Sequence, residues 1–375
     1  MRRSCVVVAV AATVCGLLSI GPPALAGRTQ GLRFHAQSQS WISPDRGRIL
    51  GSAPCDHGSC TTVIGTRDGG TTWKALGTLG APLVLEDPTG VTELVFADDL
   101  HGWAFDPTLW ATTDGGVTWQ QQATPGGRPV VALAGDADAV YAAVSACPFG
   151  QGLTDCRNRA TLWRTTPALG SWTQVSLKLP VANQASLAVH GAVAYLVIPT
   201  FDSTAPDVLD VTVDGQRWSS RQDPCSKADG EFIAGVAPVS DTGVALLCQA
   251  NIGFGMAGKR VVRSSDAAQT TSSAGTLPLN GIDSQLTAAP DGTLLVASSS
   301  IGSWIYRNAG GQTWTTSEDL GDGGLGWNDI ALTGNQVGLV IHGPASCCGQ
   351  SGPGELWRSG DGGITWRQSE VAPQP

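Results

Sequence analysis

Cysteine is the residue type whose number and spacing point most directly to chemistry in this chain. There are 10 cysteines, and two of them, Cys5 and Cys15, lie in an apolar N-terminal stretch. An even remainder in an exported chain indicates disulfides rather than metal ligands. That remainder is Cys55, Cys60, Cys147, Cys156, Cys225, Cys248, Cys347 and Cys348. Because the chain has no C-x-x-C, no H-E-x-x-H and only 5 histidines, we expect no metal site.

Two pairing patterns are compatible with these positions. Local pairing gives the bridges Cys55–Cys60, Cys147–Cys156 and Cys225–Cys248, and leaves Cys347 and Cys348 to each other. Adjacent Cα atoms are about 3.8 Å apart, below the usual disulfide range, so that vicinal bridge is strained. In the alternative, Cys347 and Cys348 pair with Cys55 and Cys60.

Carboxylates form the second chemical group, because two of them can hydrolyse a glycosidic bond. The candidates lie in predicted loops and nothing selects a pair among them: Glu86, Asp87, Asp106, Asp202, Asp207, Asp223, Asp229, Glu231, Glu318, Asp319, Asp322 and Glu355. Nucleophile-elbow, P-loop and dinucleotide motifs are not found in a strand-to-helix context. We therefore assign no catalytic residue and expect no cofactor.

The N-terminus has the organisation of a secretory signal peptide. Arg2 and Arg3 precede an apolar stretch over 5–20, and Ala24-Leu25-Ala26 offers a small-residue cleavage site. A membrane anchor is the alternative, but Gly21-Pro22-Pro23 interrupts the apolar stretch and no basic flank follows. We expect residues 1–26 to be removed, and the mature protein to be secreted.

Composition restricts the fold and the partners. The 375 residues include 49 Gly and 13 Trp, with 42% hydrophobic and 14% charged residues. This apolar content supports a folded core, and the abundant glycine suits an all-β protein with many tight turns. A net charge of −9 gives no basic field for nucleic acid or an anionic membrane surface. No segment after the signal peptide is apolar enough for stable membrane insertion.

One turn motif recurs seven times at a mean period of about 49 residues. We call these segments boxes 1 to 7: 66–73, 112–119, 165–172, 212–218, 264–271, 307–314 and 359–366. Boxes 1, 2 and 7 read S/T-x-D-G-G-x-T-W, ending in Trp73, Trp119 and Trp366. An Asp side chain can accept main-chain hydrogen bonds that close such a turn, and Gly-Gly supplies positive φ angles. The box aspartates are Asp68, Asp114, Asp214, Asp266 and Asp361.

A second apolar hairpin precedes every box, so each unit predicts four short strands. Four antiparallel strands repeated every 40 to 50 residues or so are typical of a propeller blade. We predict an all-β, seven-bladed β-propeller over residues 39–375. Residues 27–38 form an N-terminal segment, in which 32–35 could supply an extra closing strand.

The boxes resemble the Asp-box, or BNR repeat, of sialidase-type β-propellers and of photosystem II assembly factors with repeats of this kind. The resemblance covers the repeats alone and implies a structural role for the box aspartates. Sialidases also require an F/Y-R-I/L-P motif, which is absent here, and a nucleophilic tyrosine. The three tyrosines, Tyr141, Tyr195 and Tyr306, lie in or beside predicted strands as packing residues. Sialidases have six blades, so the resemblance implies a propeller without sialidase activity.

Strand alternation places the boxes and the cysteines on opposite faces. The boxes connect third and fourth strands, on what we call the box face. The loops between second and third strands, and the crossings between blades, lie on the other, the loop face, together with all eight cysteines. Loops on such scaffolds carry function disproportionately, so we expect a site at the channel mouth on the loop face. Its candidate residues are His57, Trp327, Cys347, Cys348 and Glu355, with Trp327 expected to be exposed.

The function that follows is an exported, non-catalytic binding or scaffold module for a protein or glycan ligand, acting as a monomer. The alternative is a glycoside hydrolase, which predicts two carboxyl groups about 5–10 Å apart in a loop-face pocket.

Overall fold

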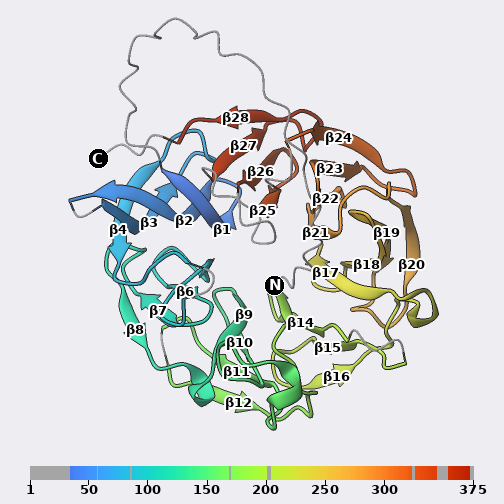
Figure 1. The fold of residues 1–375 in the computed structure, drawn as a ribbon, viewed down its shortest axis with the longest axis horizontal. Helices are drawn as coiled ribbons and strands as arrows, with labels where there is room; N and C mark the ends of the chain where they lie inside the picture. The colour runs from blue at the N-terminus through green and yellow to red at the C-terminus, as the bar shows by residue number, and fades with distance from the viewer. Residues whose placement is uncertain are drawn as a thin grey trace, which may run out of the picture.

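The computed structural model describes residues 34–371 except 57, 85–86, 169, 201–203, 323–325 and 344–353. In this part of the chain, 28 strands form seven four-stranded antiparallel sheets arranged around a central channel (Figure 1). The helical segments there are three short 3₁₀ turns, Pro125–Gly127, Leu153–Asp155 and Lys227–Asp229. No described helix has the length and apolarity needed to cross a bilayer. The prediction of a seven-bladed β-propeller is confirmed.

Each blade consists of four strands that are consecutive in the sequence. Blades 1 to 4 contain, from the channel outward, β1 (His35–Ser43), β2 (Arg46–Cys55), β3 (Gly58–Thr66), β4 (Lys74–Leu79); β5 (Glu93–Phe96), β6 (Gly102–Phe105), β7 (Leu109–Thr112), β8 (Gln120–Gln122); β9 (Val130–Gly135), β10 (Val140–Val144), β11 (Thr161–Thr165), β12 (Thr173–Val175); and β13 (Ser186–His190), β14 (Val193–Ile198), β15 (Val208–Thr212), β16 (Trp218–Ser220). Blades 5 to 7 contain β17 (Phe232–Pro238), β18 (Val244–Gly253), β19 (Met256–Ser264), β20 (Ser272–Thr276); β21 (Asp283–Ala288), β22 (Leu294–Ser299), β23 (Ser303–Asn308), β24 (Thr315–Leu320); and β25 (Trp327–Thr333), β26 (Val337–His342), β27 (Glu355–Ser359), β28 (Arg367–Ser369).

The hydrophobic core lies between blades rather than in one central mass. Tyr141 and Leu162 of blade 3, for example, share a buried cluster with Ala194 and Leu196 of blade 4. The second strand of a blade therefore faces a neighbouring blade on each side, and β14 is apolar and buried along its whole length. Tyr141, Tyr195 and Tyr306 are all buried, as expected for packing residues.

The box turns are closed by their aspartates. In box 1, Asp68 Oδ1 accepts hydrogen bonds from the N–H groups of Thr71 (3.0 Å) and Thr72 (2.9 Å), and Oδ2 accepts one from the Thr72 hydroxyl (2.6 Å). Gly69 and Gly70 adopt positive φ angles of 68° and 80°. The box glycine N–H also donates to the turn between the first two strands, from Gly69 to Asp45 O at 3.1 Å. These two turns therefore share the box face.

The same bonds keep the box aspartates ionised. Desolvation opposes ionisation at Asp68, Asp114 and Asp361, but the hydrogen bonds outweigh it and lower the pKa of each carboxyl to about 2. At Asp266 the N–H and hydroxyl of Thr270 lower the pKa to about 2. Asp214 accepts bonds from the N–H groups following it, which also lower its pKa. The carboxylates are thus bonded within their own turns.

The box tryptophans pack into the blades. Trp73 and Trp366 are buried, and Trp119 is half-buried. Trp73 meets Trp41 edge-on, with ring centroids 6.1 Å apart, and Trp119 meets Phe96 in the same way at 6.0 Å.

Non-covalent contacts between blades 7 and 1 close the ring. Gln39 Nε2 on β1 donates to Leu339 O on β26 (3.1 Å), and the Ala36 N–H donates to Gly354 O (3.1 Å). Each described sheet is complete with its own four strands, so none of them borrows a strand from the other end of the chain. Within the segment 32–35, His35 is the first residue of β1, and residues 32–33 lie outside the described part, as does the predicted signal peptide.

Candidate functional site on the loop face

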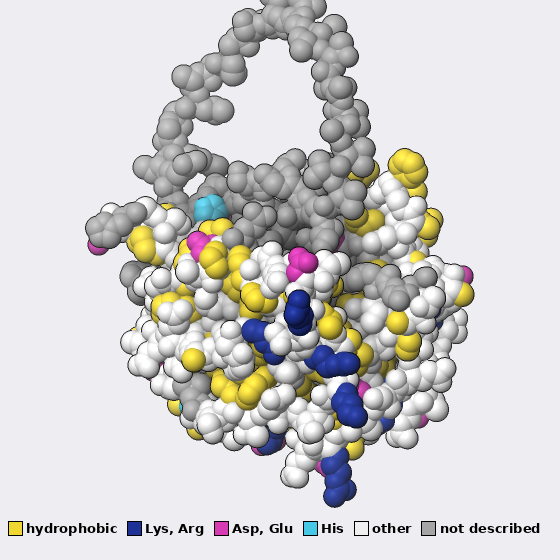
Figure 2. Space-filling view, turned by 60° about the horizontal axis from the view of Figure 1, so that its bottom comes forward, with side chains coloured by type: hydrophobic (Ala, Val, Ile, Leu, Met, Phe, Trp, Pro, Cys, Tyr) yellow, Lys and Arg dark blue, Asp and Glu magenta, His cyan; other side chains and the backbone are white. Residues whose placement is uncertain are grey.

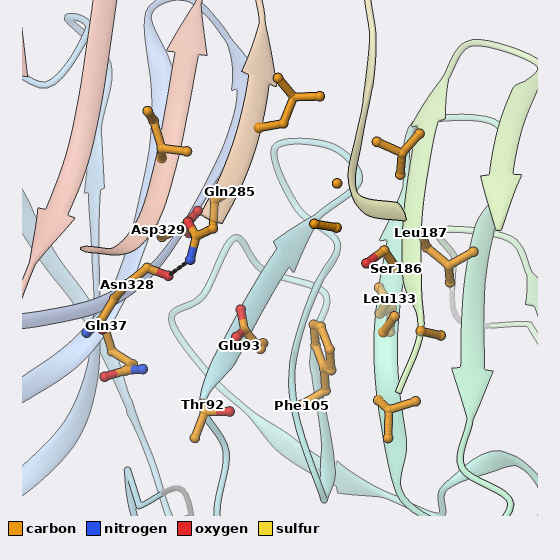
Figure 3. Close-up of a pocket in the computed structure, with 18 of the residues that line it drawn as sticks. Gln37, Thr92, Glu93, Phe105, Leu133, Ser186, Leu187, Gln285, Asn328 and Asp329 are labelled. Atoms are coloured by element: carbon orange, nitrogen blue, oxygen red, sulfur yellow. Dashed lines mark hydrogen bonds between the residues drawn. The ribbon is translucent and has the colours of Figure 1, made fainter. Parts of the chain in front are cut away.

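A cavity of about 550 Å³ occupies the central channel (Figure 3). The first strand of every blade contributes to its wall. Most of the contributing residues lie in the first half of these strands, and each such strand starts at the loop face, so the cavity opens toward that face. The wall combines an apolar surface, including Phe105, Leu133 and Leu187, with seven polar side chains: Gln37, Thr92, Glu93, Ser186, Gln285, Asn328 and Asp329.

Glu93 and Asp329 are the charged residues of this wall. They come from β5 of blade 2 and β25 of blade 7, which flank β1 of blade 1. The Ser38 hydroxyl of β1 donates its single proton to Glu93 Oε2 (3.1 Å), and the Asp329 carboxyl lies within hydrogen-bonding reach of the same hydroxyl. Asp329 Oδ2 further accepts the Gln39 N–H at 2.8 Å. One hydroxyl group therefore joins two acids from non-adjacent blades, at the mouth where a site was expected.

Asp329 is the strongly perturbed acid of the pair. Desolvation is the main cause that raises its pKa, and the negative charge of Glu93 raises it further. The hydrogen bonds from Gln39, Ile330 and Ser38 oppose this rise but do not cancel it, so the pKa reaches about 7. The carboxyl is partly accessible to water inside the channel yet surrounded by strands on every side, which accounts for this strong desolvation.

Sequence reasoning did not identify this pair. Candidate acids were sought in loops, whereas Glu93 and Asp329 lie within strands. The available signal was an acidic residue inside an otherwise apolar inner strand, as in Glu93-Leu94-Val95-Phe96. Such a residue must face either the channel or the neighbouring blade, and burial of an unpaired charge between blades is costly.

The expectation that Trp327 is an exposed ligand contact is wrong. The side chain is 1% exposed, and its Nε1 donates to Trp304 O at 3.0 Å. It is the first residue of β25, and its ring enters the core between blades 6 and 7 rather than facing solvent. The ring centroid lies 4.7 Å from that of His342.

Glu355 lies beside this aromatic cluster and not in the channel cavity. Its Oε2 is 3.6 Å from Nδ1 of the buried His342, whose Nε2 is 2.6 Å from Asp322 Oδ2. The predicted loop-face residues His57, Cys347 and Cys348 lie outside the described residues.

Three disulfides are present on the loop face. Cys55–Cys60, Cys147–Cys156 and Cys225–Cys248 have Cα separations of 5.8, 5.3 and 5.4 Å. They match the local pairing pattern. Because Cys55 and Cys60 are bonded to each other, neither is available to Cys347 or Cys348, so the alternative pairing across blades 7 and 1 does not occur.

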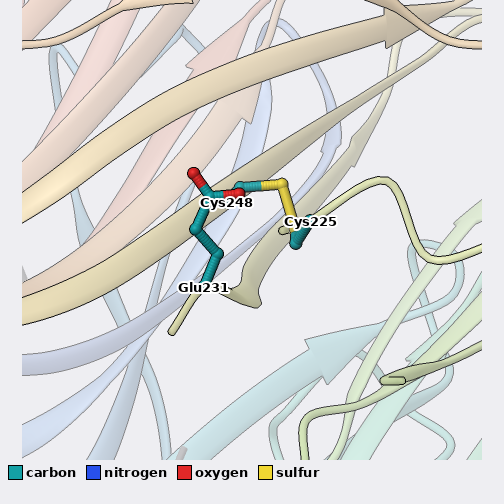
Figure 4. Close-up of side chains that lie close together, drawn as sticks. All are labelled: Cys225, Glu231 and Cys248. Atoms are coloured by element: carbon teal, nitrogen blue, oxygen red, sulfur yellow. A yellow bond between two sulfur atoms is a disulfide. The ribbon is translucent and has the colours of Figure 1, made fainter. Parts of the chain in front are cut away.

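Glu231 approaches the Cys225–Cys248 disulfide closely (Figure 4). One oxygen and the two sulfurs lie within 4.8 Å of one another, as metal ligands would. The sulfurs are already joined, however, and Glu231 accepts hydrogen bonds from Arg260 (2.6 Å) and from the Ser226 N–H (2.7 Å). The disulfide and Glu231 therefore stabilise the crossing into blade 5, and in this arrangement they do not form a metal-binding site.

Other candidate acids are also engaged in structure. Asp207 accepts hydrogen bonds from the Lys227 ammonium (2.5 Å) and from the Ile233 N–H (2.5 Å). Asp223 Oδ1 accepts one from the Cys225 N–H (2.9 Å). The Asp207 bonds link the loop before β15 of blade 4 to the crossing and to blade 5, and the Asp223 bond stabilises the crossing itself, which removes both acids from consideration as a hydrolytic pair.

Charge is unevenly distributed on this acidic chain. Figure 2 brings forward the edge of the ring that carries blades 3 and 4, where Lys and Arg side chains gather in a band. Among the basic residues of blade 3, the Arg128 guanidinium donates to Arg159 O (3.0 Å) and that of Arg159 to Leu179 O (2.9 Å). The outer rim is thus positive at blades 3 and 4, whereas the channel wall is negative.

Comparisons with known proteins give structural likenesses only. No protein-family model matches the chain, and no curated protein matches it. Among solved structures, it is similar to YCF48 bound to D1 peptide, with 18% identity, a TM-score of 0.47, and coverage of 74% of this chain and 79% of that one. The computationally designed Ika8 protein shows 12% identity, a TM-score of 0.49, and coverage of 91% and 98%. YCF48 from Cyanidioschyzon merolae shows 15% identity, a TM-score of 0.37, and coverage of 90% and 85%.

Proposed function

We propose that this chain is an exported, non-catalytic β-propeller built from Asp-box repeats, which binds a protein ligand at the channel mouth on its loop face. The observation that carries the proposal is the cavity of about 550 Å³ whose wall holds two carboxylates, Glu93 and Asp329, and no Lys, Arg or His among its described residues. A cavity of this size and mixed lining is typical of ligand sites.

The lining favours a basic side chain over a sugar. Glycan binding usually relies on an exposed aromatic ring, but Phe105, the aromatic residue of the described wall, is 4% exposed and Trp327 is buried. An arginine or lysine side chain matches both the apolar part of the wall and its acids. Its aliphatic stem can lie along Leu133 and Leu187 while its charged head reaches the acids. The ligand is therefore a protein that inserts a basic residue.

Electrostatics supports the same ligand class. Desolvation and, to a smaller extent, the Glu93 charge raise the pKa of Asp329 to about 7, so the two acids resist being ionised at once. A cation between them favours ionisation of both and lowers the pKa of Asp329. Binding should therefore strengthen as pH rises through about 7 and should release a proton near neutral pH.

A pair of model peptides tests the proposal. Acetyl-Gly-Arg-Gly-amide carries the guanidinium, and acetyl-Gly-citrulline-Gly-amide replaces it with a neutral group of nearly the same shape. In calorimetric titrations at pH 8, the arginine peptide should saturate at one site per chain and bind at least about tenfold tighter than the citrulline peptide. Equal binding of the two, or binding of neither, contradicts the proposal.

Glycoside hydrolysis is a second candidate, favoured by one observation. Glu93 and Asp329 share the Ser38 hydroxyl, and an acid with a pKa of about 7 beside a second carboxylate is the arrangement that glycosidases use. Against it, Asp329 is fixed to β1 by the Gln39 N–H. A panel of aryl glycosides decides the matter: release of aryl alcohol that both E93Q and D329N abolish supports hydrolysis, whereas no release favours the binding module.

Export and oligomeric state belong to the same proposal. We expect cleavage after Ala26, a secreted product with intact disulfides, and a monomer in solution. Mass spectrometry of the secreted chain and light scattering test these points, and an uncleaved N-terminus or a stable dimer contradicts them.

A further inference from the structure

Large apolar side chains that are exposed gather at one place on the loop face. Three segments supply them: the β18–β19 hairpin of blade 5, the crossing from blade 5 to blade 6, and the turn between β22 and β23 of blade 6. We call this surface the blade 5/6 patch, and its members are Ile252 (57% exposed), Phe254 (95%), Leu279 (46%), Ile282 (39%) and Ile301 (77%). It lies outside the channel cavity and plays no part in the proposed channel site.

Main-chain contacts show that the three segments are contiguous. The Gly281 N–H donates to Gly255 O (3.1 Å), and the Ala257 N–H donates to Leu279 O (2.8 Å), which joins the hairpin to the crossing. The Ile282 N–H donates to Ser299 O (2.9 Å), which joins the crossing to blade 6. These bonds tie the crossing to both blades, so the five exposed residues lie on adjoining segments of the loop face.

A buried lysine makes this surface rigid. Lys259 is 1% exposed, and its ammonium donates to the carbonyls of Leu279 (3.1 Å), Asn280 (2.7 Å) and Gly281 (2.9 Å). Burial lowers the pKa of Lys259 to about 8. Three successive carbonyls of the crossing therefore point inward to one cation. An interface that is already ordered loses less conformational entropy when a partner binds.

The hairpin turn explains the conformation of Phe254 but not the choice of phenylalanine at this position. Gly253 pairs with Met256, so Phe254 and Gly255 form a two-residue loop that requires positive φ angles at both residues. Phe254 lies at the tip of the hairpin between two glycines, with a φ angle of +54°. This left-handed conformation is rare for a bulky residue and costs on the order of 1 kcal/mol, whereas Gly or Asn would adopt it readily. A strained aromatic side chain that is almost fully exposed indicates a contact with something outside the chain.

We propose that the blade 5/6 patch is a docking surface for a protein partner that receives Phe254 in an apolar pocket rimmed by basic residues. The three segments, 251–257, 277–283 and 299–303, contain no Lys or Arg; Asp283 ends the second of them, and the exposed Asp319 lies on β24 opposite Trp304, next to the third. The basic residues of β19 nearest to the patch are not free, since Lys259 is buried and Arg260 is paired with Glu231. A basic rim on the partner therefore complements the surface in charge.

The same charges argue against the two other occupants. An anionic lipid surface attracts basic patches, and this patch has none. A second copy of the chain brings the same acidic flanks and a net charge of −9.

A peptide selection tests the inference without knowledge of the partner. A phage-displayed library of random 16-residue peptides is panned on the intact protein, and the selected clones are compared on F254D and I301D. The controls are V117D and I364D, because both residues are 54% exposed but lie in boxes on the opposite face. Since all four positions are exposed, none of the variants should lower the melting temperature, and F254D should raise it slightly because Asp adopts the left-handed conformation more readily than Phe.

The expected clones combine aromatic or aliphatic residues with Lys or Arg, lose at least about tenfold in binding to F254D and I301D, and bind V117D, I364D and E93Q as they bind wild type. The inference is overturned if no clone is enriched, if the clones bind F254D normally, or if they lack basic residues. It is also overturned if F254D abolishes a dimer seen by light scattering, or abolishes sedimentation with phosphatidylglycerol vesicles. Because E93Q disables only the channel, this result is separable from failure of the channel site.

Discussion

The guanidinium of Arg358 donates a hydrogen bond, 3.2 Å long, to the carbonyl of Gly69, which lies 289 positions earlier in the chain. Arg358 is on the third strand of blade 7 and Gly69 is in box 1, so this bond spans the closure of the ring. Arg307 makes the equivalent bond from blade 6 to Gly362 in box 7, at 2.8 Å. The junction that joins the two ends of the propeller therefore uses the same contact as an ordinary blade junction.

Replacement of Arg358 by methionine should weaken closure while preserving the packing of the aliphatic stem. A hydrogen bond from a charged group contributes roughly 1.5–3 kcal/mol, so we expect R358M to lower the free energy of unfolding by about 1.5 kcal/mol. Urea unfolding measures this, and R307M, which removes the same bond within the continuous chain, is the matched comparison. If R358M unfolds like wild type, Arg358 does not contribute to closure.

Removal of a box carboxylate should be costly at neutral pH and harmless in strong acid. Asp114 closes box 2 through the N–H groups of Val117 and Thr118, and its folded-state pKa is lowered to about 2. A lowered pKa contributes stability that is present above the unfolded value of about 4 and is lost as pH falls toward 2. D114A should lose about 1–2 kcal/mol at pH 7 and little at pH 2. An equal loss at both pH values contradicts this account of the turn.

Two box glycines with nearly the same positive φ angle should differ in their tolerance of a methyl group. Gly115 and Gly311 have φ angles of 78° and 77°. A Cβ at Gly115 would lie 2.8 Å from Asp99 O, whereas one at Gly311 would meet nothing within 4 Å. G311A should cost about 1 kcal/mol for the left-handed conformation alone, and G115A about 2–3 kcal/mol because the turns must also separate. Thermal unfolding tests the order, and equal costs contradict it.

The acid in the channel should make the protein less stable as pH rises through neutrality. The folded-state pKa of Asp329 is raised to about 7 from the ordinary aspartate value of 3.8, so the folded chain holds a proton that the unfolded chain has released. This proton contributes its full stabilisation below about pH 4, and the contribution decreases progressively as pH rises to about 7. D329N keeps an acceptor for the Gln39 N–H, and should be about 2 kcal/mol more stable than wild type at pH 8 but not at pH 4. Parallel pH profiles for the two proteins contradict the assignment.

The fold could be predicted because its signal is local and repeated. A Gly-Gly turn with its own acceptor, such as that of Asp68, needs no distant partner to form. Blade number and the face of each turn then follow from the spacing and from strand alternation. The local disulfides were predictable for the same reason, since a short hairpin brings Cys55 and Cys60 together.

The sequence predicts where the site lies but not which residues form it. The tilt and register of seven blades decide which residue of an inner strand faces the channel. No local sequence pattern indicates this tilt or register. Ser38 and Glu93 are 55 positions apart and meet only when blades 1 and 2 pack together, and Gln39 and Asp329 are 290 apart and meet only once the ring has closed. The exposure of Trp327 was misjudged for a related reason: the packing of blades 6 and 7, and not the local sequence, decides where the ring points.

The central claim is that a basic group binds beside Glu93 in the channel mouth. Calorimetric titration of acetyl-Gly-Arg-Gly-amide into wild type, E93Q and E370Q at pH 8 tests it most directly. E370Q is the matched control, because Glu370 is an exposed residue that follows β28 on the outside of blade 7. We predict that E93Q weakens binding by at least about tenfold while E370Q binds like wild type. Equal affinity of E93Q and wild type would contradict the claim.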